Sequence, residues 1–317
     1  MQKRPLGRTG FSVAPFAFGG NVFGWTADEA TSFRLLDAFV DAGFNLIDTA
    51  DSYSRWVTGH QGGESEAIIG RWIAKRGRHD DVVIATKVGS DMGLGKKCLR
   101  RDYIIEEVEQ SLRRLQVDAI DLYQSHWDDP DTPLEETLDA YARLIQQGKV
   151  KAIGASNLTA ERLAEALETS RRHRLPRYET LQPQYNLYDR DTFEGPLARL
   201  CAAEGIGVIT YYSLAAGFLT GKYRSEQDYG KSPRGGGMKK YLNPRGKKIL
   251  AALDEVAQRL AATPAQVALA WVIAQPGVTA PIASATTLEQ LDELITGAQL
   301  MVDGEALRTL DAASAIG

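Results

Sequence analysis

Cysteine is scarce in this sequence of 317 residues, where Cys98 and Cys201 are the only two and lie far apart. Two cysteines are too few to cross-link a secreted domain of this size, and neither belongs to a metal-ligand spacing. The first residues are basic but no apolar segment follows them, so we expect no signal peptide. These absences exclude a disulfide scaffold and a zinc module, predict no bound metal, and favour a reducing cytoplasm.

Long hydrophobic runs and charge of one sign are also lacking. The uncharged residues 263–288 include Pro264, Pro276 and Pro281, which predict a helix, a turn and a buried strand in place of a membrane span. Lysine and arginine number 37 against 41 acidic residues, a net charge of -4 with no block of like charge. Binding to nucleic acid would need a basic patch, so we expect small molecules as partners.

The phosphate-binding loops of the common nucleotide folds are missing as well. The segment GGNVFG at residues 19–24 does not have the spacing of a G-x-G-x-x-G loop. The segment GSDMGLGKK at residues 89–97 lacks the hydroxyl residue that follows the lysine of a Walker loop. A doubly wound open sheet, the usual partner of nicotinamide chemistry, is therefore disfavoured.

Short apolar runs instead alternate with amphipathic helical segments eight times, with no linker to mark a domain boundary. Such alternation predicts parallel strands joined by right-handed crossovers, and eight units predict a single (β/α)8 TIM barrel domain over residues 1–317. The expected strands are residues 16–19, 45–48, 82–87, 120–126, 151–155, 180–184, 207–211 and 280–283. The expected helices are residues 28–43, 64–77, 102–115, 133–148, 159–173, 194–205, 247–262 and 288–298.

Four polar side chains follow the carboxyl ends of successive predicted strands. Asp48 ends the second strand, Tyr53 lies on the loop after it, Lys87 ends the third strand and His126 ends the fourth. Barrel enzymes place their chemistry at this face, so we expect the four side chains to converge. Each alone is also typical of a cap, a packing residue or a solvated side chain.

The combination of these residue types predicts acid-base chemistry. A lysine beside a carboxylate stays charged, and its charge favours the ionised form of a nearby phenol, so we expect the pKa of Tyr53 to be lowered by Lys87. A phenol tuned in this way can donate a proton to a carbonyl oxygen. A histidine within hydrogen-bond reach would orient that oxygen.

The same residues carry a resemblance to a known family. The segments DTADSY (48–53), ATK (85–87), YQSH (123–126), GASN (154–157) and GFLTGKY (217–223) resemble the aldo-keto reductase superfamily, in order and over nearly the whole chain. Within this superfamily, the sequence most resembles the bacterial branch that is related to potassium-channel β subunits. The resemblance implies a catalytic tetrad, with Tyr53 as general acid, Lys87 tuning it, Asp48 holding Lys87, and His126 steering the carbonyl group.

The resemblance also implies an NADPH/NADP+ site along the remaining strand ends. Ser156, Asn157 and Gln182 would hold the nicotinamide carboxamide, and Tyr211 would stack on the ring. Lys222 and Arg234, on the long loop between residues 213 and 246, would grip the cofactor phosphates and favour NADPH over NADH. The other implied cofactor contacts are Gly20, Asn21, Asp48, Ser213 and Leu214, with Ser284, Gln290 and Glu293 at the adenosine.

Three positions depart from the pattern of the family. Tyr212 adds an aromatic ring after Tyr211, where it would narrow the cofactor tunnel or touch the substrate. Ser284 stands where the family usually has a glycine, and Leu294 stands where it often has an asparagine. The resemblance therefore defines the adenine contacts less well than the tetrad.

The implied substrate is a small carbonyl compound that is reduced to an alcohol. Trp25, Trp56 and Trp127 are expected on loops at the mouth, where they would hold an apolar or ring-bearing molecule or only pack. Arg55 would bind an anionic substrate, or it would be exposed to solvent without a ligand. A nicotinamide-binding sensor with little turnover and a barrel enzyme of unrelated chemistry remain alternatives, and the sequence leaves the oligomeric state open.

Overall fold

The computed structural model describes residues 2–316 and contains a closed barrel of eight parallel strands. The strands follow the order β10-β3-β4-β5-β6-β7-β8-β9 around the barrel, so neighbours in sequence are neighbours in space. Their bounds are β3 Ala17–Gly19, β4 Leu46–Asp48, β5 Val83–Val88, β6 Ile120–Ser125, β7 Val150–Ser156, β8 Thr180–Gln182, β9 Gly207–Thr210 and β10 Val278–Ala283. The predicted (β/α)8 barrel is confirmed.

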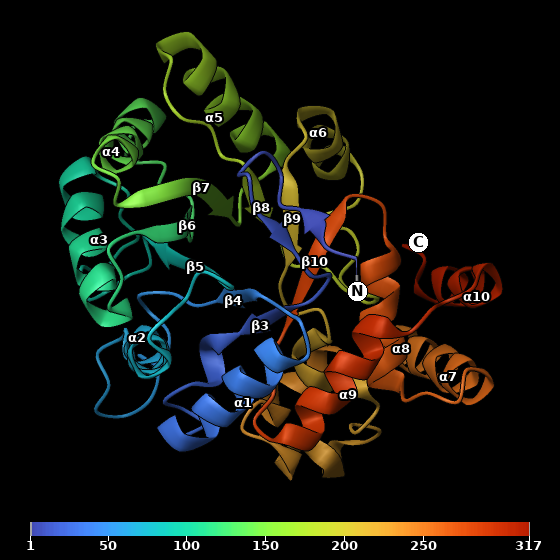
Figure 1. Ribbon diagram of the computed structural model, residues 1–317. Helices are drawn as coiled ribbons and strands as arrows, with labels where there is room; N and C mark the ends of the chain where they lie inside the picture. Colours follow the sequence, from blue (N-terminus) through green and yellow to red (C-terminus); the bar gives the residue numbers. More distant parts are fainter. Residues whose placement is uncertain (1, 317) are drawn as a thin grey trace.

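Helices surround this ring of strands, as Figure 1 shows. They are α1 Glu29–Asp41, α2 Glu64–Arg76, α3 Arg101–Leu115, α4 Leu134–Gln146, α5 Ala160–His173, α6 Pro196–Glu204, α7 Pro244–Arg259, α8 Pro264–Ala274, α9 Leu288–Gln299 and α10 Gly304–Ser314. Thr159, Thr263 and Thr287 are the N-caps of α5, α8 and α9. The side-chain oxygen of each threonine accepts a hydrogen bond from the backbone N–H three residues later, which stabilises the start of the helix. Helix α10, which packs on α7, was not predicted from the sequence.

Two separate apolar cores stabilise the barrel. The larger one fills the space between the strands and the helices. The smaller one lies inside the barrel and takes alternate residues from its strands, such as Leu46, Val83, Ala85 and Leu122. Because side chains alternate between the two faces of a strand, the residues two further along, Asp48 after Leu46 and Lys87 after Ala85, also face inward. The position of the site therefore follows from the strand period.

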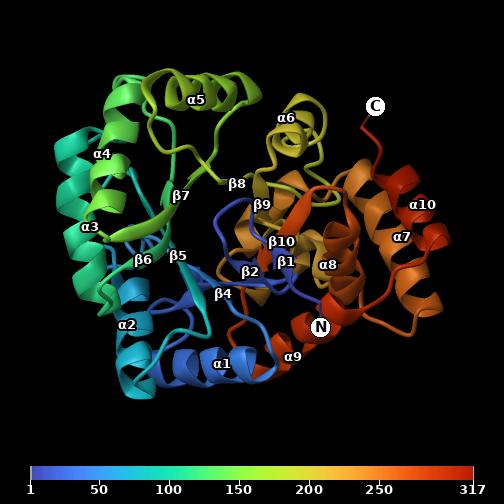
Figure 2. The same cartoon turned by 45° about the horizontal axis from the view of Figure 1, so that its top comes forward.

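The amino-terminal end of the barrel is closed by a hairpin that the sequence did not predict, β1 Arg4–Pro5 with β2 Ser12–Val13. Figure 2 shows this hairpin beside β9 and β10. Leu6 joins the inner core, and Gly7 lies so close to the backbone before β8 that an added Cβ would be 2.1 Å from the carbonyl oxygen of Glu179. The opposite, carboxyl end of the barrel is open to a ligand.

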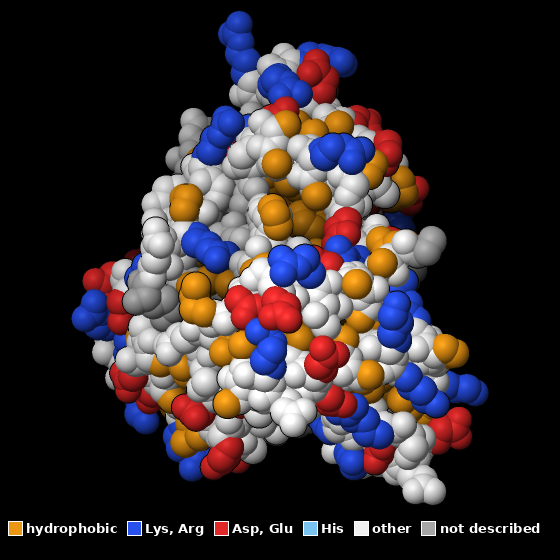
Figure 3. All heavy atoms as spheres, turned by 90° about the vertical axis from the view of Figure 1, so that its right-hand side faces the viewer, with side chains coloured by type: hydrophobic (Ala, Val, Ile, Leu, Met, Phe, Trp, Pro, Cys, Tyr) orange, Lys and Arg blue, Asp and Glu red, His pale blue; other side chains and the backbone are white. Residues whose placement is uncertain are grey.

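The long segment after β9 is folded into short 3-10 helices, η2 Ala215–Thr220, η3 Glu226–Lys231 and η4 Gly235–Lys240. Another, η1 Gly20–Val22, follows β3. Acidic and basic side chains are interspersed over the face shown in Figure 3, without a patch of one sign. None of the helices within residues 2–316 has both the length and the apolar character needed to cross a membrane.

Candidate active site

The carboxyl end of the barrel opens into a cavity of about 1450 Å³. This volume exceeds the usual range for a single drug-sized ligand, which leaves room for a cofactor and a substrate together. Most of the residues predicted from the sequence line it, namely Asn21, Trp25, Asp48, Tyr53, Trp56, His126, Trp127, Asn157, Gln182, Tyr211, Ser213, Leu214, Lys222, Arg234, Ser284, Gln290 and Glu293. Three others, Gly20, Lys87 and Ser156, lie just behind this lining.

Lys87 is the centre of a buried polar cluster. Its Nζ lies 2.7 Å from Asp48 Oδ2, 2.8 Å from the carbonyl oxygen of Thr49 and 2.9 Å from the hydroxyl of Tyr53. Three acceptors match the three hydrogens of an ammonium group, so its donors are saturated. The lysine is 0% exposed, and burial lowers its pKa, although the Asp48 carboxylate beside it opposes this shift. The structure thus brings together three members of the predicted tetrad, while their roles stay predictions.

His126 lies beside Tyr53, with the two ring centroids 6.0 Å apart. Ser90, two residues after the end of β5, has its hydroxyl 2.9 Å from His126 Nδ1 and fixes the plane of the imidazole. The sequence reasoning missed Ser90, although its place after a strand end was an available signal. Burial, aided by the charges of Lys87 and Lys97, lowers the pKa of His126 well below its ordinary value. The imidazole is therefore neutral at pH 7.

The expected lowering of the Tyr53 pKa is not what the structure produces. Burial raises the pKa of this phenol well above its usual value, and the Asp48 carboxylate at 3.2 Å raises it further. The sequence argument counted the positive charge of Lys87 but neither the loss of water nor the carboxylate that balances that charge. A phenol in this setting stays protonated, which is the form that a proton donor needs.

The residues predicted to hold the nicotinamide form one connected network with the cluster. Gln182 donates from Nε2 to Asp48 Oδ1 at 2.8 Å, and the Ser156 hydroxyl donates to the backbone oxygen of Gln182 at 2.7 Å. The Tyr211 hydroxyl donates to Asn157 Oδ1, also at 2.7 Å. These bonds fix the position of each side chain before any ligand binds, and the predicted contacts to a carboxamide remain untested.

Tyr212 adopts a left-handed backbone conformation, with a φ of 53° that is uncommon for a tyrosine. The buried Asn186 holds it there by donating to its carbonyl oxygen at 3.0 Å. Its ring packs edge-on against Tyr211, with centroids 5.2 Å apart, and is 46% exposed. The extra aromatic noted in the sequence therefore lines the cavity beside the ring that is predicted to stack on a cofactor.

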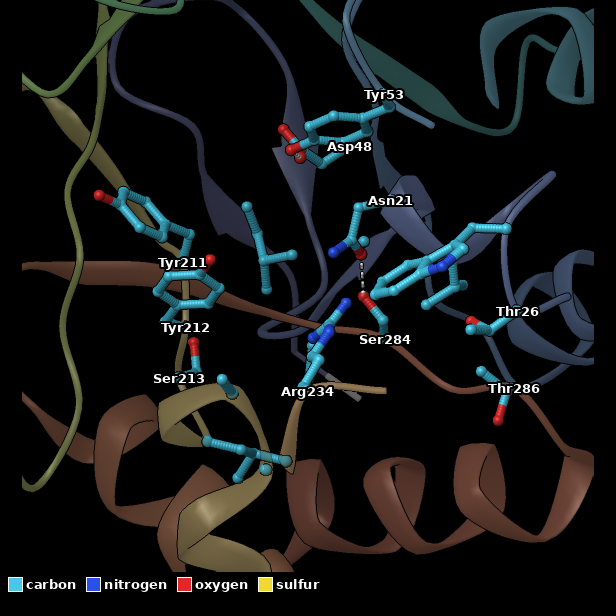
Figure 4. Close-up of a pocket in the computed structure, with 18 of the residues that line it drawn as sticks. Asn21, Thr26, Asp48, Tyr53, Tyr211, Tyr212, Ser213, Arg234, Ser284 and Thr286 are labelled. Atoms are coloured by element: carbon cyan, nitrogen blue, oxygen red, sulfur yellow. Dashed lines mark hydrogen bonds between the residues drawn. The ribbon is translucent and has the colours of Figure 1, made fainter. Parts of the chain in front are cut away.

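Arg234, at the start of η4, brings a positive charge into the cavity from the long segment after β9. Figure 4 shows it between Tyr212 and the hydrogen-bonded pair Asn21 and Ser284, whose side-chain oxygens are 2.7 Å apart. Within residues 2–316 its guanidinium has neither a hydrogen bond nor an ion pair, and burial lowers its pKa. A partly buried cation that lies over the Trp25 ring but has no counter-ion among the described residues fits an anionic ligand, which is what the phosphates of the implied cofactor would supply.

Comparison with known proteins agrees with this fold. The family model described as "Aldo/keto reductase family" matches residues 15–315. The chain is 36% identical to the uncharacterized oxidoreductase YrpG of Bacillus subtilis, over 98% of this chain and 95% of that one. It is 37% identical to the aldo-keto reductase YhdN of the same organism, over 90% and 84%. It is also 33% identical to a probable voltage-gated potassium channel subunit beta of rice, over 92% and 90%.

The closed eight-stranded barrel and the family match together define a barrel oxidoreductase. The chain belongs to the aldo/keto reductase family. The resemblance noticed in the sequence is thereby confirmed, including the kinship with potassium-channel subunits. Membership indicates an oxidoreductase that acts on carbonyl compounds, in a family that generally uses a nicotinamide cofactor.

Proposed function

We propose that this protein reduces an aldehyde or ketone to an alcohol, reversibly, with NADPH as the hydride donor and Tyr53 as the proton donor. The observation that carries the proposal is the contact of Lys87 with both Asp48 and Tyr53 in a buried cluster that opens to a large cavity. The bound cofactor would supply the hydride. The residues of the chain would bind the two molecules, orient them and move one proton.

In this mechanism the Tyr53 hydroxyl donates its proton to the carbonyl oxygen of the substrate. Lys87 holds the phenol in place and stabilises the negative charge that remains on its oxygen after the transfer. Asp48 keeps Lys87 charged and fixed. The neutral His126, held by Ser90, presents its Nε2 to the same carbonyl oxygen and orients it.

The proposed cofactor contacts follow the lining of the cavity. Tyr211 would stack on the nicotinamide, Gln182 and Asn157 would bind its carboxamide, and Arg234 and Lys222 would pair with phosphate oxygens. Ser284, Gln290 and Glu293 would hold the adenosine. A cytoplasmic location is part of the same proposal, since NADPH is available there.

A single-turnover experiment separates this enzyme from a sensor that binds a nicotinamide without turning it over, the alternative suggested by the channel-subunit relative. The purified protein is loaded with one equivalent of NADPH and mixed with a panel of reactive aldehydes. We expect loss of the absorbance of the reduced nicotinamide together with formation of the alcohol. A cofactor that stays bound and reduced across the whole panel would favour the sensor, and a failure to bind NADPH would point to unrelated barrel chemistry.

Substitution of Arg234 by alanine tests the phosphate contact. A charge-assisted hydrogen bond is worth about 1.5 to 3 kcal/mol, so Arg234→Ala should weaken NADPH binding roughly ten-fold or more and barely change NADH binding. Titration of the tryptophan fluorescence with each cofactor measures this difference.

Lys231→Ala is the matched control, because Lys231 lines the same cavity but already pairs with Asp228 at 2.7 Å. It should leave both affinities near those of the unaltered protein. Equal losses for NADPH and NADH in Arg234→Ala would move Arg234 away from the phosphate that distinguishes the two cofactors.

A further inference from the structure

The part of the cavity that surrounds Tyr53 on the side of the loops after β3, β4 and β6 is walled by aromatic rings. Trp25 and Trp56 meet edge-on with centroids 5.5 Å apart, and Trp56 lies 6.1 Å from the ring of Tyr53. The His126 and Trp127 rings are stacked at 5.8 Å and 16°. Trp56 is 52% exposed and lines the cavity. Flat rings on several sides of the Tyr53 hydroxyl fit a flat, ring-bearing carbonyl compound.

The charges next to this aromatic wall have different partners. The guanidinium of Arg55, which the sequence suggested for an anionic substrate, donates to the backbone oxygen of Asp91. The Asp91 carboxylate in turn accepts the amides of Gly93 and Gly95, at 2.9 and 3.0 Å. Arg55 and Asp91 thus hold the loop between β5 and α3 in shape.

Lys97, on the same loop, is placed differently. Its Nζ lies 4.1 Å from the centroid of the Trp127 ring. Within the part of the chain from residue 2 to 316 it has neither a hydrogen bond nor an ion pair, whereas its neighbour Lys96 pairs with Asp131 at 3.1 Å. Burial and the charge of Lys87 lower the pKa of His126, and the positive charge of Lys97 lowers it further. Lys97 is therefore close enough to interact electrostatically with the site. The series His126, Trp127 and Lys97 therefore runs from the predicted reaction centre to an exposed cation that lies over the Trp127 ring and pairs with no carboxylate among the described residues.

We propose that the substrate is a ring-bearing aldehyde or ketone that carries an anionic group, and that Lys97 binds this group beside Trp127. The carbonyl oxygen lies at Tyr53 and His126, and the ring lies among the tryptophans. This inference rests on the proposed reductase function. The hydride and the proton add across the carbonyl bond to give a hydroxyl group, and the anionic group passes through the reaction unchanged.

The test compares charged and neutral forms of one substrate. The 2-, 3- and 4-carboxybenzaldehydes are assayed against their methyl esters by oxidation of NADPH. An exposed ion pair is worth up to about 1 kcal/mol, so Lys97→Gln should lower kcat/KM for at least one of the acids roughly five-fold and leave the corresponding ester unchanged. Lys97→Glu should lower the ratio of acid to ester further, and added salt should reduce the ratio only when Lys97 is present.

Lys96→Gln is the matched control, since it removes a neighbouring lysine whose charge is already paired, and it should change neither substrate. If no acid-to-ester ratio depends on residue 97, the inference is wrong, while turnover of the esters still supports the reductase. A readout without turnover is the quenching of tryptophan fluorescence by the isomeric phthalates, which should weaken in Lys97→Gln. If neither the acids nor the esters oxidise NADPH, the proposed function is wrong. Equal quenching by the phthalates in the unaltered protein and in Lys97→Gln would separately reject Lys97 as the anion site.

Discussion

Replacement of Tyr53 by phenylalanine should lower kcat for carbonyl reduction by about 10² to 10⁴, because the change removes the proton donor and keeps the ring. NADPH affinity should stay near that of the unaltered protein, since the deleted hydroxyl points at Lys87 and Asp48 and not along the predicted cofactor cradle. Single-turnover oxidation of bound NADPH gives the rate, and titration of tryptophan fluorescence gives the affinity.

His126→Gln is the comparison for this variant, because it keeps a hydrogen-bonding side chain in place of the imidazole. It should act mainly on substrate orientation and therefore raise KM more than Tyr53→Phe does. A Tyr53→Phe enzyme with most of its kcat, beside an inactive His126→Gln enzyme, would assign the acid role to the imidazole.

The pH dependence gives a second check on the same assignment. A general acid works below its own pKa, and burial raises the pKa of Tyr53 above its ordinary value, so its proton is present throughout the neutral range. Burial also keeps His126 neutral, because its pKa lies well below the ordinary value. The single-turnover rate of reduction should therefore be flat from about pH 6 to about pH 9. A fall in rate with a midpoint near neutral pH would show that a group with a much lower pKa is the acid.

Substitution of Lys87 by methionine should damage both stability and activity. Asp48 is 1% exposed, and loss of its cation leaves a buried carboxylate without its charge partner, which costs about 3 to 5 kcal/mol of unfolding free energy. The rate should fall as well, because the oxygen of Tyr53 loses the charge that stabilises it after proton transfer. Chemical denaturation measures the first effect, and single-turnover reduction measures the second.

The double variant Asp48→Asn with Lys87→Met separates the two effects. Removal of both charges abolishes the unpaired buried carboxylate, so stability should recover in large part while activity stays low. Lys151→Met is the control, since Lys151 pairs with Asp121 at 2.7 Å but is 49% exposed at its side chain and lies at the amino-terminal half of the barrel. Recovery of activity in the double variant would show that Lys87 has a purely structural role.

The prediction of the fold succeeded because it depended on repetition along the chain. Eight apolar runs separated by amphipathic segments allow few arrangements, and every predicted strand is found within a few residues of its expected bounds. The β1 and β2 hairpin, helix α10 and the short 3-10 helices were missed. The hairpin of β1 and β2 has only two residues in each strand, and its pairing depends on contacts with the ends of β8 and β9 that lie about two hundred residues away. Helix α10 came after the last barrel unit, where the repeat no longer predicted a helix.

The sequence by itself determined where the site lies. Asp48, Lys87 and His126 follow inward-facing residues at intervals of two, so the strand period alone directs them to one end of the barrel. The residues that carry the family motifs are the same ones, which is why the resemblance and the spacing agreed.

Only the tertiary structure decided the chemical state of these groups. The pKa of Tyr53 rises because burial and the carboxylate of Asp48 outweigh the effect of Lys87, and the sequence does not reveal how much water each group loses. The same holds for the cations. Arg55 donates to the backbone of a neighbouring loop, Lys97 lies over the Trp127 ring, and Arg234 reaches the cavity from a segment far along the chain. Desolvation and hydrogen bonding depend on neighbours in space, so these properties appear only when the barrel is closed.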